Sequence, residues 1–277
     1  MKHPWEGACE PFQIYGNLYF VGTRPASTHL IDTGEGLIVI DSGYPQSLYL
    51  VIDSIYRMGF KPEDVKIILH SHGHYDHLGA TRALAEMTGA KTYISEIDAP
   101  YADGSVDLTW ARELGHAYNE AFTPDVLLRD GDVIKLGNTE ILCWITPGHT
   151  PGTTSFFFDV YGEQGAKRCA MFGGAGFNSM GRKFLDKYGL PHSLRSDFIR
   201  SCRRLQTQDI DIFLGNHVAN NDTLGKYQKM KETGENPFLN TNEEWKRYLR
   251  ALEKEMTDKI MTACPEEMPA DLLPNKE

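Results

Sequence analysis

Five histidines and one aspartate form a pattern that would suit metal binding. His72, His74, Asp76 and His77 lie within six residues of one another, directly after the apolar run 65–69. A strand that ends there would present these donors at its carboxyl end, where open α/β sheets place their ligands. His72 and His74 are two residues apart, so their side chains point the same way in extended backbone. A solvated histidine-rich loop is the alternative interpretation.

Two more histidines occur in similar settings and argue against that alternative. His149 follows the apolar run 141–145, and His217 follows the run 211–214. Both runs have the length of a strand. Six donors are too many for one tetrahedral zinc ion, but they fit two open sites of three donors each, which a bridging water or hydroxide would complete. The sequence therefore predicts a two-metal hydrolytic centre.

The composition is that of an ordinary globular enzyme. Hydrophobic residues make up 41% of the 277 residues and charged residues 24%. A chain of this length buries roughly 75% of its unfolded surface, which predicts a single domain over residues 1–277. The net charge of −10 disfavours a nucleic-acid partner. No apolar run is long enough to span a membrane. The first residues lack a signal-peptide core, which predicts a cytoplasmic protein, or a periplasmic or secreted one if the sequence is a trimmed mature form.

Apolar runs and helical patterns divide the chain into two comparable halves, roughly 1–125 and 126–264, followed by a loose tail at 265–277. The expected strands are 18–21, 37–40, 67–69, 92–94, 133–136, 141–145, 155–158, 170–172 and 212–214. The expected helices are 46–58, 77–87 with a stop at Gly89, 197–206, and a helical patch at 107–122 in a segment that overhangs the site.

The last expected helix begins with a capping-box spacing. Thr241 and Glu244 are three residues apart, as in the sequence pattern in which each side chain caps the other's backbone amide. The apolar stripe that follows predicts packing on a sheet; it consists of Trp245, Tyr248, Leu249, Leu252 and Met256.

The donor pattern resembles the signature of the metallo-β-lactamase superfamily, His72-x-His74-x-Asp76-His77 with His149 and His217. The likeness covers roughly residues 10 to 260. Three segments outside the donors resemble the class B β-lactamases of the third subclass; they are 16–22, 40–47 and 148–152. The resemblance implies an α/β fold, a four-layer αβ/βα sandwich of two mixed β-sheets flanked by helices.

By that resemblance the chain holds two zinc ions. The first would be held by His72, His74 and His149, and the second by Asp76, His77 and His217. Asp76 would also be catalytic, because a carboxylate beside a bridging hydroxide can orient it and accept its proton.

Two residues are expected to support the donors without binding metal. Asp41 would tie the loop that presents the ligands, or would simply make a hydrogen bond at a strand end. His70, at the end of the strand before the donors, is expected in the second shell.

The sequence departs from the related enzymes in the stretch 173–176. Many dizinc relatives, including the lactonases and thioester hydrolases, carry a metal-bridging aspartate there, whereas this chain reads Gly-Gly-Ala-Gly. The third-subclass enzymes usually place serines in the same stretch to bind the substrate carboxylate, where this chain has Ala175 and Phe177. Asn178 and Ser179 are the candidates for substrate binding, with turn formation as the alternative.

Three functions remain open. The first is a zinc-dependent hydrolase that uses a metal-bridging hydroxide to open a cyclic amide, as a β-lactamase does. The second is a dizinc hydrolase of another ester, lactone or amide, with little β-lactamase activity. The third is a non-catalytic metal-binding module. The missing aspartate favours the first, and the missing serines and signal peptide favour the second. Open coordination positions argue against the third. In each enzymatic case the partner is a small-molecule substrate, and the oligomeric state is undetermined.

Overall fold

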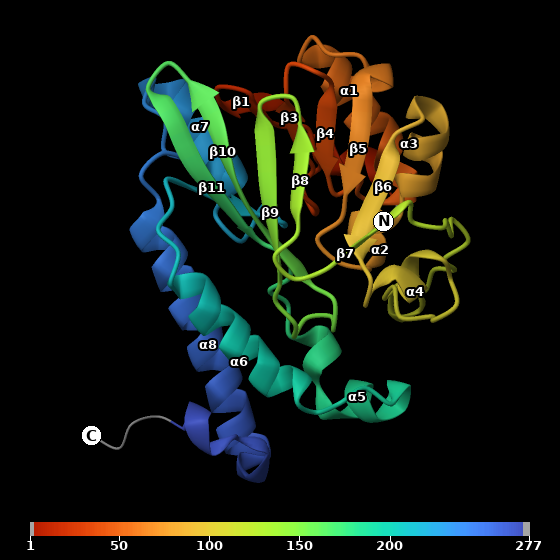
Figure 1. Ribbon diagram of the computed structural model, residues 1–277, viewed down its shortest axis with the longest axis vertical. Coiled ribbons are helices and arrows are strands. Elements are labelled where there is room, and N and C mark those ends of the chain that lie inside the picture. Colours follow the sequence, from red (N-terminus) through yellow and green to blue (C-terminus); the bar gives the residue numbers. More distant parts are fainter. Residues whose placement is uncertain (1–2, 274–277) are drawn as a thin grey trace.

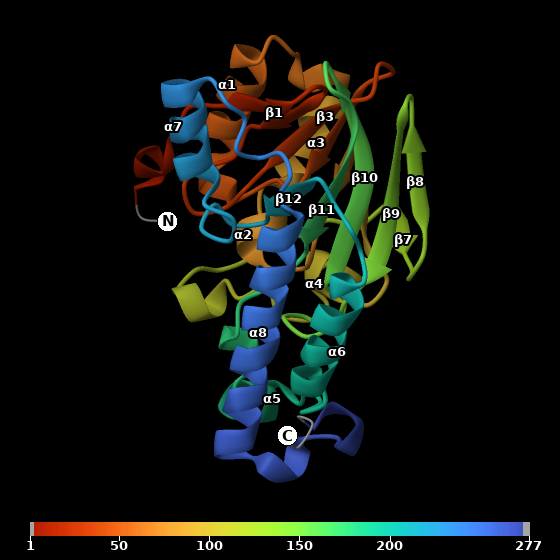
Figure 2. The same cartoon turned by 90° about the vertical axis from the view of Figure 1, so that its left-hand side faces the viewer.

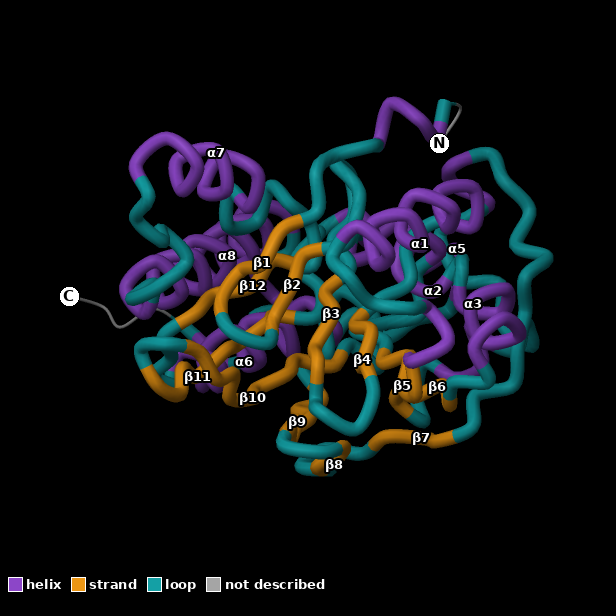
Figure 3. The backbone as a smooth tube through the Cα atoms, turned by 90° about the horizontal axis from the view of Figure 1, so that it is seen from above, coloured by secondary structure: helices purple, strands orange, loops and turns teal. Residues whose placement is uncertain are grey.

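The computed structural model describes residues 3–273, in which two mixed β-sheets pack face to face and helices cover both outer faces (Figure 1). The view from above separates these layers, with helices on either side of the strands (Figure 3). The predicted four-layer αβ/βα sandwich is confirmed. Within the described residues, no helix has the length and apolar character needed to cross a membrane.

The first sheet has seven strands in sequence order, antiparallel from β1 to β4 and parallel from β4 to β7. Its strands are β1 (Phe12–Tyr15), β2 (Leu18–Phe20), β3 (His29–Asp32), β4 (Leu37–Ile40), β5 (Val65–Leu69), β6 (Lys91–Ser95) and β7 (Val126–Leu128).

The second sheet has five strands in the order β12-β11-β10-β9-β8, antiparallel except for the β11–β12 pair. Its strands are β8 (Val133–Leu136), β9 (Thr139–Ile145), β10 (Thr154–Gly162), β11 (Gly165–Phe172) and β12 (Ile212–Gly215).

Within residues 3–273, α-helices flank the two sheets. They are α1 (Leu48–Arg57), α2 (Tyr75–Leu78), α3 (Thr81–Thr88), α4 (Ala99–Ala102), α5 (Arg182–Tyr188), α6 (Leu194–Gln206), α7 (Thr223–Thr233) and α8 (Asn242–Ala263). Helices α6 and α8 lie side by side and extend beyond the second sheet (Figure 2), joined by an ion pair between Arg203 and Glu253.

Alternation along the strands explains the layers, because successive strand side chains point to opposite faces of a sheet. Phe156 and Phe158 of β10 lie in the core between the two sheets, whereas Phe157 lies in the core under α6 and α8. On β4, Ile38 faces the central core and Val39 packs in the core under α1 and α3. Every strand with two such faces must therefore be apolar on both.

The structure changes the predicted helix 77–87. The helix is broken into α2 and α3, because Gly79 and Ala80 pass close to the loop after β4. A Cβ atom on Gly79 would lie 2.5 Å from Pro45, and the amide of Ala80 donates to the carbonyl of Gly43. The predicted stop at Gly89 is confirmed, since this glycine ends α3 with a left-handed φ of 69°.

Three other local predictions are wrong. Residues 107–122 form only a short 3-10 turn at Arg112–Leu114. Thr241 does not cap α8, because its hydroxyl accepts the amide hydrogen of Phe213 at 2.7 Å and so ties the helix to β12. Met268 and Leu272 are buried in the core under α6 and α8, so residues 265–273 are not loose. Residues 274–277 lie outside the described part of the chain.

We expect Trp245→Ala to lower the free energy of unfolding by about 3–5 kcal/mol, the usual result of truncating a buried tryptophan. Trp245 is fully buried between α8 and the second sheet, with its ring 5.2 Å from that of Phe213. Trp5→Ala is the matched control, because Trp5 is 63% exposed and its removal should change stability by less than about 0.5 kcal/mol. Urea unfolding checks both values, and equal stability of the two variants would contradict this packing.

Candidate metal centre

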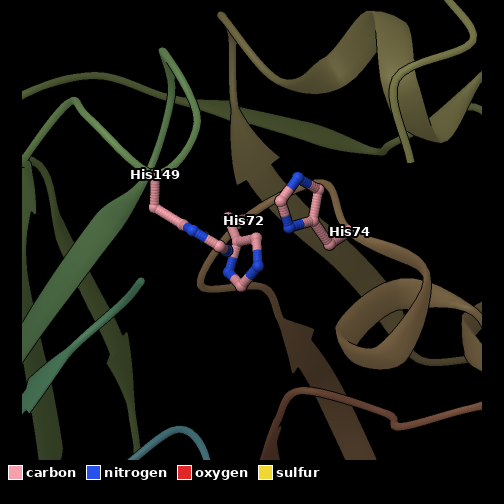
Figure 4. Close-up of side chains that lie close together, drawn as sticks. All are labelled: His72, His74 and His149. Carbon is pink, nitrogen blue, oxygen red and sulfur yellow. The ribbon is translucent and has the colours of Figure 1, made fainter. Parts of the chain in front are cut away.

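The six predicted donors meet at one end of the two sheets. His72 and His74 follow β5, Asp76 and His77 belong to α2, His149 follows β9, and His217 follows β12. Figure 4 shows His149 reaching from the second half of the chain toward His72 and His74 of the first half. The segments converge because both sheets end their donor-bearing strands at this same edge, as sequence reasoning expected.

His72, His74 and His149 form the first group, and their ligand atoms lie within 4.8 Å of one another. The ring of His72 is 4.7 Å from that of His74 and 4.6 Å from that of His149. The Nε2 atom of His72 is buried and has no hydrogen-bond partner among the described residues. Because a buried polar atom without a partner is costly, this nitrogen is well suited to a metal ion.

Asp76, His77 and His217 form the second group. The Nε2 atoms of the two histidines are 3.2 Å apart, and each lies 3.4 Å from Oδ2 of Asp76. A tetrahedral ion with bonds of about 2.0–2.1 Å holds its donors about 3.3 Å apart. The three atoms therefore already have the spacing of one face of a tetrahedral site.

Hydrogen bonds at the opposite ring nitrogens fix which nitrogen of each histidine is free. The Nδ1 atom of His77 donates to Asp41 at 2.8 Å, that of His217 to the carbonyl of Pro25 at 2.6 Å, and that of His149 to the carbonyl of Gly176 at 2.7 Å. In neutral imidazoles this places the proton on Nδ1 and the lone pair on Nε2. The two facing Nε2 atoms of His77 and His217 would then repel each other unless a metal ion or a proton lay between them.

The electrostatics of the site agree with this arrangement. Burial lowers the pKa values of His72, His74, His149 and His217, so these imidazoles are neutral, as metal binding requires. Burial also disfavours the charged form of His77, but the carboxylates on either side of the ring, Asp76 and Asp41, raise its pKa. The second group therefore favours a positive charge at its centre.

Asp41 holds together the loop that carries the donors. The residue is buried with a left-handed φ of 59°, and its carboxylate accepts the amide of Ser71 at 2.8 Å, the hydroxyl of Ser71 at 2.7 Å and Nδ1 of His77. Asp41 thus combines the two expected roles, since it makes hydrogen bonds directly after the end of β4 and ties the loop that carries the donors.

His70 supports the same region at one remove. Its ring nitrogens contact the carbonyl of Tyr93 at 2.8 Å and the hydroxyl of Thr81 at 2.6 Å. Thr81 in turn contacts Ser42, whose hydroxyl donates to the carbonyl of His77. Both nitrogens of His70 are therefore engaged away from the six donors.

Sequence reasoning missed Asp98, which connects the two donor-bearing loops. Its buried carboxylate accepts the amide of Gly73 at 2.9 Å, the hydroxyl of Thr150 at 2.6 Å and the amide of Gly152 at 2.8 Å. Burial raises the pKa of Asp98 to about 6, against the effect of these hydrogen bonds. Its place four residues after the expected strand 92–94, at the same sheet edge as the histidines, was the available signal.

A cavity of about 390 Å³ opens onto both donor groups. Of the two candidates for substrate binding, Asn178 lines this cavity and Ser179 does not. Ser179 is buried and donates to the backbone carbonyl of His149, so it supports the loop that carries His149 instead of facing the cavity. The wall also includes Tyr44, Trp110, Leu114, Asn216, Asn220, Tyr248 and Leu252. The stripe of α8 thus serves both the core and the cavity.

The segment predicted to overhang the site does so through Trp110. The indole ring lies 6.0 Å from the ring of His74 and 4.8 Å from that of Phe184 in α5. Next to this contact, Glu113 pairs with Lys187 at 3.2 Å and accepts a hydrogen bond from Tyr188. The cavity therefore has a wall in which residues 110–114 and α5 hold each other in place.

Comparisons with known proteins agree with the fold and the donor set. Residues 21–162 match the family model of the metallo-beta-lactamase superfamily. The chain is 30% identical over 158 residues to the probable metallo-hydrolase YflN of Bacillus subtilis, and 24% identical over 161 residues to an N-acyl homoserine lactonase of a Bacillus species. These matches cover 52% and 49% of this chain, and 56% and 59% of the relatives, so they span little more than half of each relative's length.

Similarity to solved structures extends over nearly the whole chain. The native FEZ-1 metallo-beta-lactamase of Legionella gormanii matches with a TM-score of 0.85 and 28% identity, covering 94% of this chain and 98% of that one. The class B3 di-zinc metallo-beta-lactamase LRA-12 from an Alaskan soil metagenome matches with a TM-score of 0.80 and 29% identity, covering 92% and 96%.

The fold and the paired donor groups define a protein built to hold metal ions at a sheet edge. The chain belongs to the metallo-β-lactamase superfamily, whose members are metal-dependent hydrolases.

We expect Asp41→Asn to weaken metal binding at the second group by 10- to 100-fold, because an amide is a poorer acceptor for Nδ1 of His77. Asp53→Asn is the control, since the Asp53 side chain is 63% exposed on α1. Titration with Zn²⁺ against a chromophoric chelator measures both affinities. Unchanged binding in the Asp41 variant would show that this carboxylate does not orient the ligand.

Proposed function

We propose that this protein is a zinc-dependent hydrolase that opens a cyclic amide, with a β-lactamase-like activity. The observation that carries the proposal is the small side chain of Ala175. It lines the cavity beside the donors, in the stretch where lactonases and thioester hydrolases carry a bridging aspartate. Without that carboxylate, the centre resembles the lactamase type, and whole-chain similarity to class B3 enzymes supports the same reading.

The two glycines before Ala175 leave no room for a side chain. A Cβ atom on Gly173 would lie 2.0 Å from the carbonyl oxygen of Thr154, and one on Gly174 would lie 2.6 Å from the ring of His149. Among positions 173–175, position 175 is therefore the place from which a side chain reaches the cavity.

The donor set fits two zinc ions. Imidazole nitrogens and a carboxylate oxygen are ordinary zinc ligands, and three donors at each site leave a position open for water or substrate. Zinc held by these donors would supply a water with a pKa lowered to about 7 and would polarise the substrate carbonyl.

The remaining steps fall to side chains of the chain. As the water oxygen bonds to the carbonyl carbon and the C–N bond breaks, a proton must pass from the water to the leaving nitrogen. Asp76 lines the cavity, and its Oδ2 atom lies 3.4 Å from Nε2 of both His77 and His217, so its carboxylate is placed to accept the proton of the water and pass it on. The cavity has the volume of a small-molecule site, which supports a small-molecule substrate.

A second candidate is the hydrolysis of a lactone or another ester. The sequence similarity to N-acyl homoserine lactonases favours it, as does the lack of a serine at positions 175 and 177. Phe177 cannot replace such a serine, because its ring packs on Phe198 at 5.4 Å in the helical layer.

Turnover of a chromogenic cephalosporin, a carbapenem and an N-acyl homoserine lactone by the zinc-loaded protein separates the two candidates. The proposal predicts hydrolysis of at least one β-lactam with higher kcat/KM than the lactone. Lactone turnover with no β-lactam turnover at micromolar enzyme would replace the first candidate by the second.

We expect Ala175→Asp to raise the ratio of lactone to β-lactam kcat/KM by about tenfold, because the new carboxylate would reach both donor groups and change the charge that the substrate meets. Ala175→Asn has nearly the same shape without the charge and is the matched control. Steady-state kinetics on both substrates give the ratio. An equal effect of the two variants would mean that shape, and not the carboxylate, controls the choice.

A further inference from the structure

Tyr44 stands at a position in the cavity that neither the donors nor the mechanism above uses. It follows the loop of Asp41 at the end of β4 and lines the cavity together with Asp76 and His217. Its side chain is half-buried and thus reaches the space beside the second donor group from the first half of the chain.

The hydroxyl of Tyr44 is uncommitted. The hydrogen bonds of this residue within residues 3–273 go to its backbone carbonyl, from the amide and the hydroxyl of Ser47. The phenol hydroxyl itself has no protein partner among these residues. A tyrosine hydroxyl keeps its proton at neutral pH because its ordinary pKa is about 10, so it can donate a hydrogen bond to a substrate.

The ring of Tyr44 is held in place by Tyr75, whose own position is fixed by a hydrogen bond from Gln46. It packs edge-on against Tyr75 at 5.9 Å, with an interplanar angle of 73°. The hydroxyl of Tyr75 accepts a hydrogen bond from Gln46 at 2.8 Å. The position of the Tyr44 hydroxyl is therefore set by the protein before any substrate arrives, which makes its hydrogen bond more favourable.

Some polar groups around the cavity are already paired, whereas the side chain of Asn178 and the hydroxyl of Tyr248 are, like that of Tyr44, without a hydrogen bond among the described residues. The amide nitrogen of Asn220 donates to Asn216 at 2.6 Å, and Asn216 donates to the carbonyl of Gly173 at 2.8 Å. Lys187, the cation in the wall formed with α5, pairs with Glu113. Tyr44 lines the cavity together with Asp76 and His217, so its free hydroxyl is available to a substrate oxygen beside the second donor group.

We propose that Tyr44 is a substrate-contacting residue that donates its phenol hydrogen to a carboxylate oxygen of the substrate. The inference rests on the proposed function, because it names the group that takes over the carboxylate binding for which this chain lacks serines.

Binding of a small thiol tests the inference without requiring turnover. The probes are 3-mercaptopropionate and its methyl ester, which share a metal-binding thiol and differ in the carboxylate. Calorimetry on the zinc-loaded protein should show tighter binding of the acid. In Tyr44→Phe the affinity for the acid should fall about tenfold, as expected for the loss of one hydrogen bond to a charged group, while the ester changes less than about twofold.

Tyr49→Phe is the matched control, because it removes the same hydroxyl from a side chain that is 53% exposed on α1. It should leave both affinities unchanged. Equal loss of acid and ester binding in Tyr44→Phe, or no loss of either, would overturn the inference. So would a wild-type protein that holds no zinc or binds the two probes equally.

Kinetics with a penicillin and its methyl ester separate this inference from the proposed function. For the free acid, Tyr44→Phe should raise KM about tenfold and leave kcat within about twofold. A wild-type protein that hydrolyses no β-lactam would reject the proposed function, and the thiol probes would still decide the role of Tyr44.

Discussion

The structure depends on imidazole nitrogens that are buried close together with their lone pairs facing one another. Such nitrogens gain little from each other and are cut off from water, so a cation is the natural partner for them. What makes the arrangement possible is an oxygen acceptor behind three of the rings. Asp41 behind His77, the Pro25 carbonyl behind His217 and the Gly176 carbonyl behind His149 each accept a hydrogen bond from the far N–H.

These acceptors also join the two halves of the chain at the site. His217 belongs to the second half but is oriented by Pro25 of the first, and Asp98 of the first half holds Thr150 and Gly152 of the second. The backbone crosses the same boundary, since the amide of Thr154 donates to the carbonyl of Ser71. The donors therefore depend on the docking of the two sheets, and not on either half by itself.

Much of the site could be predicted because its signals are local. The apolar run of residues 37–40 became β4 without change, and the donors follow their strands as expected. What escaped prediction depends on contacts distant in sequence. Thr241 has the spacing of a helix cap relative to Glu244, but its hydroxyl instead accepts a hydrogen bond from the amide of Phe213. Asp98 acquires its partners only in the folded protein, where Thr150 of the His149 loop donates to its carboxylate. The hydroxyl of Ser179 likewise faces away from the cavity, because it donates a hydrogen bond to the carbonyl of His149.

The most direct test of the account is the number of zinc ions that each chain retains, measured by native mass spectrometry after reconstitution. The wild-type protein should hold about two, while His149→Ala and His217→Ala should each hold about one, because each variant removes a donor from a different group. Retention of no zinc by the wild type, or of two ions by both variants, would contradict a centre built from two groups of three donors.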